Sequence, residues 1–210
     1  MKPSFGAIAT PHVHNEIIQI QDPIPQQILA MAKALVSIIG FRDHYTASHS
    51  ARVARYVRNI ATQLVLPDTE TETLVSAASL HDIGKAGISD QILLKPGKLT
   101  TEELAWMQKY PEWGWMTLSQ VEGFQRAALL VLHQREKIDG SGYPKGLRGE
   151  EIPLGSRIIS VADCFDALTS DRPYRNALSR EAALAELMRC SGTQFDPEVV
   201  NAFLTALTRG

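Results

Sequence analysis

The sequence is short of cysteine and of long apolar runs, and each shortage excludes a class of protein. Cys164 and Cys190 are the two cysteines in 210 residues, and they lack the close spacing of metal or redox motifs. We therefore expect free thiols rather than a disulfide framework. No apolar run approaches the roughly 18 residues of a membrane span, and the polar N-terminus lacks the apolar core of a signal peptide. These absences predict a cytoplasmic protein that does not contact a membrane.

The sequence also lacks a strong charge of either sign. Lysine and arginine number 21 against 23 aspartates and glutamates, a net charge of −2, which argues against a surface that grips long nucleic acid. A small anionic ligand held by a few local cations is still compatible with this balance. Since a chain of this length buries about 70% of the surface that it exposes when unfolded, it forms a core without needing a bound metal for stability. Any bound metal would therefore serve chemistry.

The spacing of apolar residues predicts an all-α fold with no convincing strand. We expect residues 1–24, which contain three prolines, to form an N-terminal arm, and residues 25–210 to form one domain. Gly40 is expected to end the first helix, and Asp68 to cap the third. Residues 137–153 hold four glycines and two prolines, which predicts a long, shaped loop. Helices are expected at about 25–39, 46–65, 68–84, 100–108, 121–133, 155–169, 179–190 and 196–208, with a short piece from 111.

Two histidines fall on the buried sides of their predicted helices. His49 shares a face with Val53, and His81 lies at helical spacing from Leu74. Asp82 follows His81 directly, and Asp163 occurs in a later helix. Taken singly, each could be a satisfied core histidine or a capping carboxylate. Together they are costly to bury without a cation. A mixed nitrogen and oxygen set suits Mn²⁺, Fe²⁺, Ni²⁺ or Zn²⁺.

Five segments, in this order and spacing, resemble the HD superfamily of metal-dependent phosphohydrolases and, within it, the HD-GYP branch. The similarity runs from about residue 41 to residue 203. The matching segments are DHYTASHSARV (43–53), LHDIGK (80–85), ILLKPGKL (92–99), DGSGYP (139–144) and VADCFDALT (161–169), followed by RPYR (172–175).

The resemblance implies a helical bundle that hydrolyses bacterial cyclic dinucleotides, above all cyclic di-GMP. It also implies that the loop Gly142-Tyr143-Pro144 shapes the substrate groove and docks diguanylate-cyclase-type partners. The implied metal ligands are His49, His81, Asp82 and Asp163, and Asp82 normally bridges to a second metal. The implied catalytic residues are Asp82 and Lys85, with Lys85 near the scissile phosphate. The implied substrate-binding residues are Arg172, Arg175 and Tyr143.

This sequence departs from the family pattern at the second metal site. Tyr110, Gln134 and Arg135 occupy positions where the family has histidines, and Tyr45 replaces the glutamate that serves a third metal in some members. We expect the Arg135 guanidinium to repel a second cation and to pair with Asp82. His133, one position away from the lost pair, is a weaker substitute because one helical step turns a side chain by about 100°. The resemblance thus predicts one divalent metal, or none.

Three functions stay open from the sequence. The first is a slow phosphodiesterase of cyclic di-GMP or a related cyclic dinucleotide. The second is a catalytically inert module that binds a nucleotide or a protein partner. The third is a mononuclear nucleotide phosphatase. The retained histidines, aspartates, lysine and arginines favour chemistry, whereas the lost histidines favour the inert module.

Overall fold

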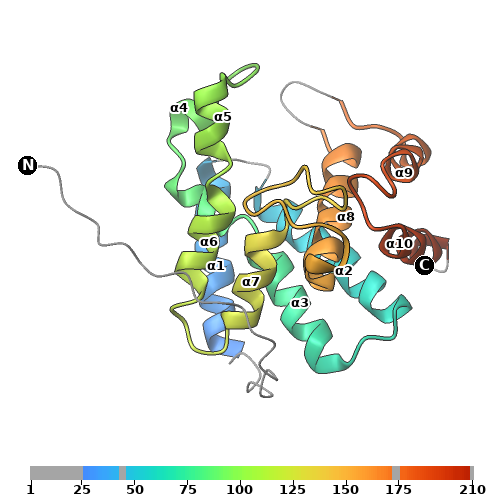
Figure 1. Cartoon of the computed structure of the whole chain (residues 1–210). Coiled ribbons are helices and arrows are strands. Elements are labelled where there is room, and N and C mark those ends of the chain that lie inside the picture. Colours follow the sequence, from blue (N-terminus) through green and yellow to red (C-terminus); the bar gives the residue numbers. More distant parts are fainter. Residues whose placement is uncertain (1–25, 43–45, 172–175, 209–210) are drawn as a thin grey trace, which may run out of the picture.

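The computed structural model describes residues 26–42, 46–171 and 176–208, in which helices are joined by loops (Figure 1). They contain no strand beyond an isolated bridge between Ser191 and Phe195, so the all-α prediction is confirmed. Residues 1–24 lie outside the described ranges, and the division into arm and domain stays a prediction. The α-helices are α1 (Gln26–Arg42), α2 (Thr46–Gln63), α3 (Asp68–Leu80), α4 (Asp90–Leu93), α5 (Thr101–Met107), α6 (Tyr110–Leu118), α7 (Gln125–His133), α8 (Leu154–Thr169), α9 (Arg180–Arg189) and α10 (Pro197–Thr208), with 3-10 turns η1 (Ile83–Gly87) and η2 (Gly149–Glu151).

Helix α2 lies at the centre of the packing, where it contacts α1, α3, α8 and α10. Its residues Val53, Val57 and Ile60 recur at helical spacing and are fully buried. Burying each such side chain contributes roughly 1.5–3 kcal/mol. His49 lies one turn before Val53 and is buried with this face, as the periodicity predicted. The packing of the apolar face therefore turns a histidine toward the interior.

Several helix ends follow local sequence chemistry. Thr100 begins α5 with a capping box, in which its hydroxyl accepts from the Glu103 amide at 3.2 Å and the Glu103 carboxylate accepts from the Thr100 amide at 2.7 Å. Ser179 caps α9 by accepting from the Ala182 amide. Within the described ranges no helix has both the length and the apolar character needed to cross a membrane.

Several predicted helix ends were wrong, and α7 begins at Gln125 rather than at about residue 121. Helix α1 continues past Gly40 to Arg42, because one glycine costs a helix only about 1 kcal/mol and does not stop it. Asp68 is the first helical residue, and Pro67 stands at the cap position; the carboxylate there still favours the helix dipole. Helix α3 ends at Leu80, and the residues after Asp82 tighten into η1.

The glycine-rich loop folds back on the end of α7. The buried Glu136 carboxylate accepts from the backbone amides of Lys145 at 2.7 Å and Leu147 at 3.1 Å. Gly142 lies so close to the backbone of residues 135–137 that a Cβ would collide with it. The loop is therefore held in one shape beside the polar centre of the molecule.

Gly84 permits the close packing of η1 against α6, which brings Asp82 and Lys85 up to Tyr110. We expect Gly84→Ala to lower the free energy of unfolding by about 2 kcal/mol or more, since its methyl group would collide with backbone atoms of Tyr110 and Gly114. Gly114→Ala, on the facing helix, is the control. Its nearest neighbour would be Val131 Cγ1 at 3.0 Å, so we expect a change within about 1 kcal/mol. Urea unfolding measures both, and equal effects would contradict this explanation.

Candidate metal centre

Three helical elements bring the predicted ligands together. Helix α2 supplies His49, the end of α3 supplies His81 and Asp82, and α8 supplies Asp163; all four are buried. Asp163 Oδ1 lies 3.0 Å from His49 Nε2 and 3.8 Å from His81 Nε2. Asp82 Oδ1 lies 3.6 Å from His81 Nε2. Residues 114 positions apart in the chain thus meet at one point.

The His81 imidazole presents one nitrogen to this point. Its Nδ1 bonds the Ala78 carbonyl at 2.7 Å, so Nδ1 is the donor and Nε2 carries the lone pair. His81 Nε2 and Asp82 Oδ1 are buried and have no hydrogen-bond partner in the described part of the chain. Leaving such groups unpaired costs about 1–3 kcal/mol each. Burial also lowers the pKa of His81, which keeps the imidazole neutral. His49, His81 and Asp163 each bring one ligand atom to within 4.8 Å of the others, an arrangement that fits a divalent cation. Asp82 Oδ1 lies beside this group, 3.6 Å from His81 Nε2, and is not one of its three members.

His49 bridges two carboxylates. Its Nδ1 lies 2.6 Å from Asp166 Oδ2, opposite the contact between Nε2 and Asp163. Burial lowers the pKa of His49, but the hydrogen bonds to Asp163 and Asp166 outweigh it and raise the pKa to about 9. His49 is thus protonated, and a metal ion bound by this imidazole would have to displace a proton from it. Asp166 was missed by the sequence reasoning, although its spacing of three from Asp163 on one helix was an available signal.

Arg52 holds Asp166 in place. Its Nε donates to Asp166 Oδ1 at 2.6 Å and its Nη2 donates to Oδ2 at 2.9 Å, a bidentate pair. Burial raises the pKa of Asp166, but the bonds from His49 and Arg52 prevail and lower it to about 2. The carboxylate is therefore ionised and fixes the orientation of the His49 ring.

Arg135 pairs with Asp163, and the expectation that it would pair with Asp82 was wrong. Its Nη2 lies 2.7 Å from Asp163 Oδ2, and its Nε donates to the Tyr110 hydroxyl at 2.6 Å. The reason is that Asp82 Oδ2 already accepts from Lys85 Nζ at 2.7 Å. The Arg135 charge outweighs the effect of burial and holds the pKa of Asp163 well below its usual range.

The other substituted positions support this arrangement. Gln134 is buried, and its Nε2 donates to the carbonyl of His81 at 2.6 Å. Tyr110 is buried against the Arg135 guanidinium, which lies 5.8 Å from the ring centroid. His133 turns away, with Nδ1 at 3.6 Å from Glu136 Oε1. The side chains at the three substituted positions thus form a hydrogen-bonded wall on one side of the centre; they are Tyr110, Gln134 and Arg135.

Within the described part of the chain, each acidic side chain of the centre has a cationic partner. Asp82 pairs with Lys85, Asp163 with Arg135, and Asp166 with Arg52. Lys85 outweighs burial and lowers the pKa of Asp82. Because these charges already balance, the centre attracts a dication less strongly than an unpaired acidic cluster would. The described residues that could hold a metal ion are His49, His81 and Asp163.

Some of the remaining predicted residues lie within the described part of the chain, and others lie outside it. Tyr143 is half-buried beside the centre, where burial raises the pKa of its hydroxyl. Its amide donates to the Arg135 carbonyl at 3.2 Å, which ties the loop to the wall. Arg172, Arg175 and Tyr45 lie outside the described residues. Both cysteines are free thiols, as predicted.

Comparisons of this chain with known proteins agree on its family. The profile of the HD domain matches residues 23–199. The chain is 46% identical over 172 residues to the cyclic di-GMP phosphodiesterase response regulator RpfG of Xanthomonas campestris, covering 81% of this chain and 46% of that protein. It is 43% identical over 174 residues to 3'3'-cGAMP-specific phosphodiesterase 3 of Vibrio cholerae, covering 83% and 38%. The chain thus spans less than half the length of these relatives.

Solved structures agree on the fold. A cyclic GMP-AMP specific phosphodiesterase of V. cholerae, V-cGAP3, superposes with a TM-score of 0.56 at 37% identity, covering 88% of this chain and 42% of that one. Bd1817, an HDG"Y"P protein from Bdellovibrio bacteriovorus, gives a TM-score of 0.62 at 20% identity, covering 87% and 63%. The second likeness concerns the fold alone.

The charge balance predicts the metal content of the purified protein. We expect no more than one equivalent of Mn²⁺, Fe²⁺, Ni²⁺ or Zn²⁺ to be retained in elemental analysis after gel filtration. His81→Ala should weaken that binding by more than about tenfold, because it removes a ligand nitrogen. His133→Ala, which alters a histidine outside the cluster, should leave it unchanged. Two tightly bound equivalents would refute the one-metal reading.

Proposed function

We propose that the protein is a metal-dependent phosphodiesterase of cyclic dinucleotides, because the chain belongs to the HD domain family, in its HD-GYP branch. The proposed substrates are cyclic di-GMP or a related cyclic dinucleotide such as 3'3'-cGAMP, on which relatives are named to act. The proposed turnover is slow. Hydrolysis joins a water oxygen to phosphorus, breaks one phosphorus–oxygen bond to ribose and releases a linear dinucleotide.

The observation that carries this proposal is the pair of unpartnered, buried donor atoms, His81 Nε2 and Asp82 Oδ1. His81 Nε2 lies 3.6 Å from Asp82 Oδ1 and 3.8 Å from Asp163 Oδ1, and Asp163 Oδ1 lies 3.0 Å from His49 Nε2. In the proposed enzyme these four residues hold one divalent transition metal, Fe, Mn, Ni or Zn. Such an ion supplies Lewis-acid polarisation of a phosphoryl oxygen and lowers the pKa of a bound water.

The cations of the chain would counter the charge of the phosphate. Lys85 is largely buried, held by Asp82, and its Nζ lies 5.7 Å from the centroid of the Tyr110 ring. Arg135 uses Nε and Nη2 on Tyr110 and Asp163, which leaves Nη1 without a partner in the described residues. Positive charge fixed before the reaction stabilises the phosphoryl transition state without reorganisation. We assign Lys85 and Arg135 to that role.

Residues beside the centre would bind the rest of the substrate. We assign phosphate binding to Arg172 and Arg175, and contact with the substrate to Tyr143. The ordered loop Gly142-Tyr143-Pro144 is the proposed docking site for a diguanylate-cyclase-type protein. Its support is the anchoring by Glu136, which holds the loop at the mouth of the centre.

A second function, an inert signalling module, is favoured by the charge balance of the centre. If Lys85, Arg135 and Arg52 neutralise the carboxylates strongly, the centre binds metal too weakly to be occupied at physiological metal concentrations. The groove and the Gly-Tyr-Pro loop would then bind a nucleotide or a protein partner without turnover.

A direct assay separates these functions. We expect cyclic di-GMP or 3'3'-cGAMP, incubated with the protein and Mn²⁺ or Fe²⁺, to yield linear dinucleotide or mononucleotide on chromatography. Asp82→Asn should lower the rate by more than about 100-fold, since it removes a ligand charge and the partner of Lys85. Asp68→Asn on the exposed start of α3 is the control and should keep full activity. Binding without product selects the inert module, and activity that survives Asp82→Asn rejects the proposed site.

Restoring the family's histidines tests the role of the wall. The triple variant Tyr110→His, Gln134→His, Arg135→His removes the guanidinium and offers three imidazoles. We expect metal content to rise from one equivalent to two, and turnover to rise by about tenfold or more, because two-metal sites hold both attacking and leaving oxygens. Elemental analysis reads the first effect independently of activity. An unchanged metal content in the folded variant would show that these positions do not decide metal number.

A further inference from the structure

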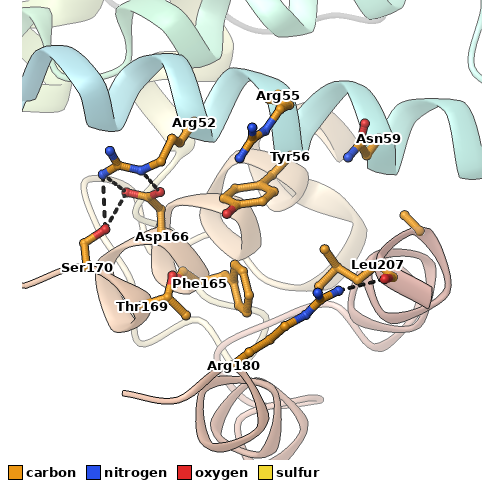
Figure 2. A pocket seen from close by; sticks show the side chains of 11 residues that line it. Arg52, Arg55, Tyr56, Asn59, Phe165, Asp166, Thr169, Ser170, Arg180 and Leu207 are labelled. Atoms are coloured by element: carbon orange, nitrogen blue, oxygen red, sulfur yellow. Dashed lines mark hydrogen bonds and ion pairs between the residues drawn. The ribbon is translucent and has the colours of Figure 1, made fainter. Parts of the chain in front are cut away.

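A pocket of about 520 Å³ opens beside the metal centre, between α2, α8 and α10 (Figure 2). Its volume lies within the range of small-molecule sites, about 300–1,000 Å³. None of His49, His81, Asp82 and Asp163 lines it. The lining residues are Arg52, Arg55, Tyr56, Asn59, Phe165, Asp166, Thr169, Ser170, Arg180, Ala206 and Leu207.

The pocket lining is strongly cationic, although the chain as a whole is slightly acidic. Three arginines face one carboxylate, Asp166, and that carboxylate is bonded to Arg52 and His49. Arg55 and Arg180 have no acidic partner among the described residues. Arg180 Nη2 donates to the Leu207 carbonyl at 2.7 Å, and the Arg55 guanidinium lies 5.4 Å from the centroid of the Tyr56 ring. Two guanidinium charges are therefore available for an anion.

The space between these arginines is aromatic and carries one free amide. Figure 2 shows Arg55 and Arg180 extending from opposite walls, with the rings of Tyr56 and Phe165 between them. Tyr56 packs edge to face on Phe165 at 5.3 Å between centroids, which makes this wall rigid. The Asn59 side chain, on the same face of α2, makes no hydrogen bond with any described residue. An amide of this kind can pair with the edge of a base.

We propose that this pocket binds a nucleotide, with its phosphate between Arg55 and Arg180 and its base against Tyr56. Guanidinium groups recognise phosphate with charge-assisted bonds, and aromatic rings stack on bases. An inorganic anion would use the arginines and leave the aromatic wall uncovered, so a ligand with both parts fits better. This site is separate from the proposed catalytic centre and does not depend on its activity.

Calorimetry with guanosine 5′-monophosphate tests the proposal on the full chain, with a chelator present so that the metal centre is not loaded. We expect this nucleotide to bind at least about tenfold more tightly than guanosine or inorganic phosphate alone. The double variant Arg55→Gln, Arg180→Gln should weaken binding by at least about tenfold, since each charge-assisted bond contributes roughly that factor. Arg58→Gln is the matched control, because Arg58 is an exposed arginine of α2 that pairs with Glu72 outside the pocket.

Three results would overturn the assignment. Binding that survives Arg55→Gln, Arg180→Gln, or that disappears in His81→Ala, would place the nucleotide elsewhere or in the metal centre. Equal affinity for inorganic phosphate and the nucleotide would reduce the pocket to a simple anion site. Because Arg180 also holds the end of α10, the single variant Arg55→Glu repeats the test at an exposed side chain. It should abolish measurable binding while circular dichroism stays unchanged.

Discussion

Pairing of buried carboxylates with fixed cations is the constraint on which the centre of this molecule depends. Asp82, Asp163 and Asp166 are each nearly fully buried, and an ionised carboxylate in that position is stable only with a partner. Lys85, Arg135 and Arg52 supply that partner from three different elements. Two of these pairs, Arg135 with Asp163 and Arg52 with Asp166, join elements that are far apart in the chain and help to hold them together.

The same pairing sets the chemistry that the centre can perform. His81 Nε2 and Asp82 Oδ1 stay unpartnered and retain the capacity to bind a cation. Arg135, however, brings a permanent positive charge to the adjoining space, and a guanidinium cannot lose its proton to make room for a metal. A guanidinium can orient a phosphate, but it cannot coordinate a water oxygen as a Lewis acid, which is how a metal ion lowers the pKa of water. The one-metal chemistry proposed for this protein rests on this arginine in the neighbouring position.

Asp166 joins the two polar regions of the protein. On one side it bonds the His49 ring, and on the other it accepts both bonds from Arg52 at the edge of the arginine-lined pocket. A movement of Arg52 would therefore displace Asp166, which contacts His49, a proposed metal ligand. Helices α2 and α8 supply both regions, so the pocket and the centre share one rigid support.

Local sequence was sufficient for much of the fold. Apolar spacing predicted the helices and the inward position of His49 and His81, because helical periodicity fixes which side chains share a face. The Thr100 capping box and the shaped loop were predictable for the same reason, since both depend on residues close in the chain. The motif order identified the family, and with it the residues that meet at the centre.

Tertiary structure alone decided how the charges are shared. The sequence could not tell that Arg135 selects Asp163 while Lys85 takes Asp82, because that choice depends on distances between helices far apart in the chain. The pocket of Arg55 and Arg180 was invisible for the same reason, whereas the spacing of Asp166 from Asp163 on one helix was a signal that the sequence did offer. Helical periodicity determines the face on which a residue lies, whereas the packing of helices determines which charge it meets there.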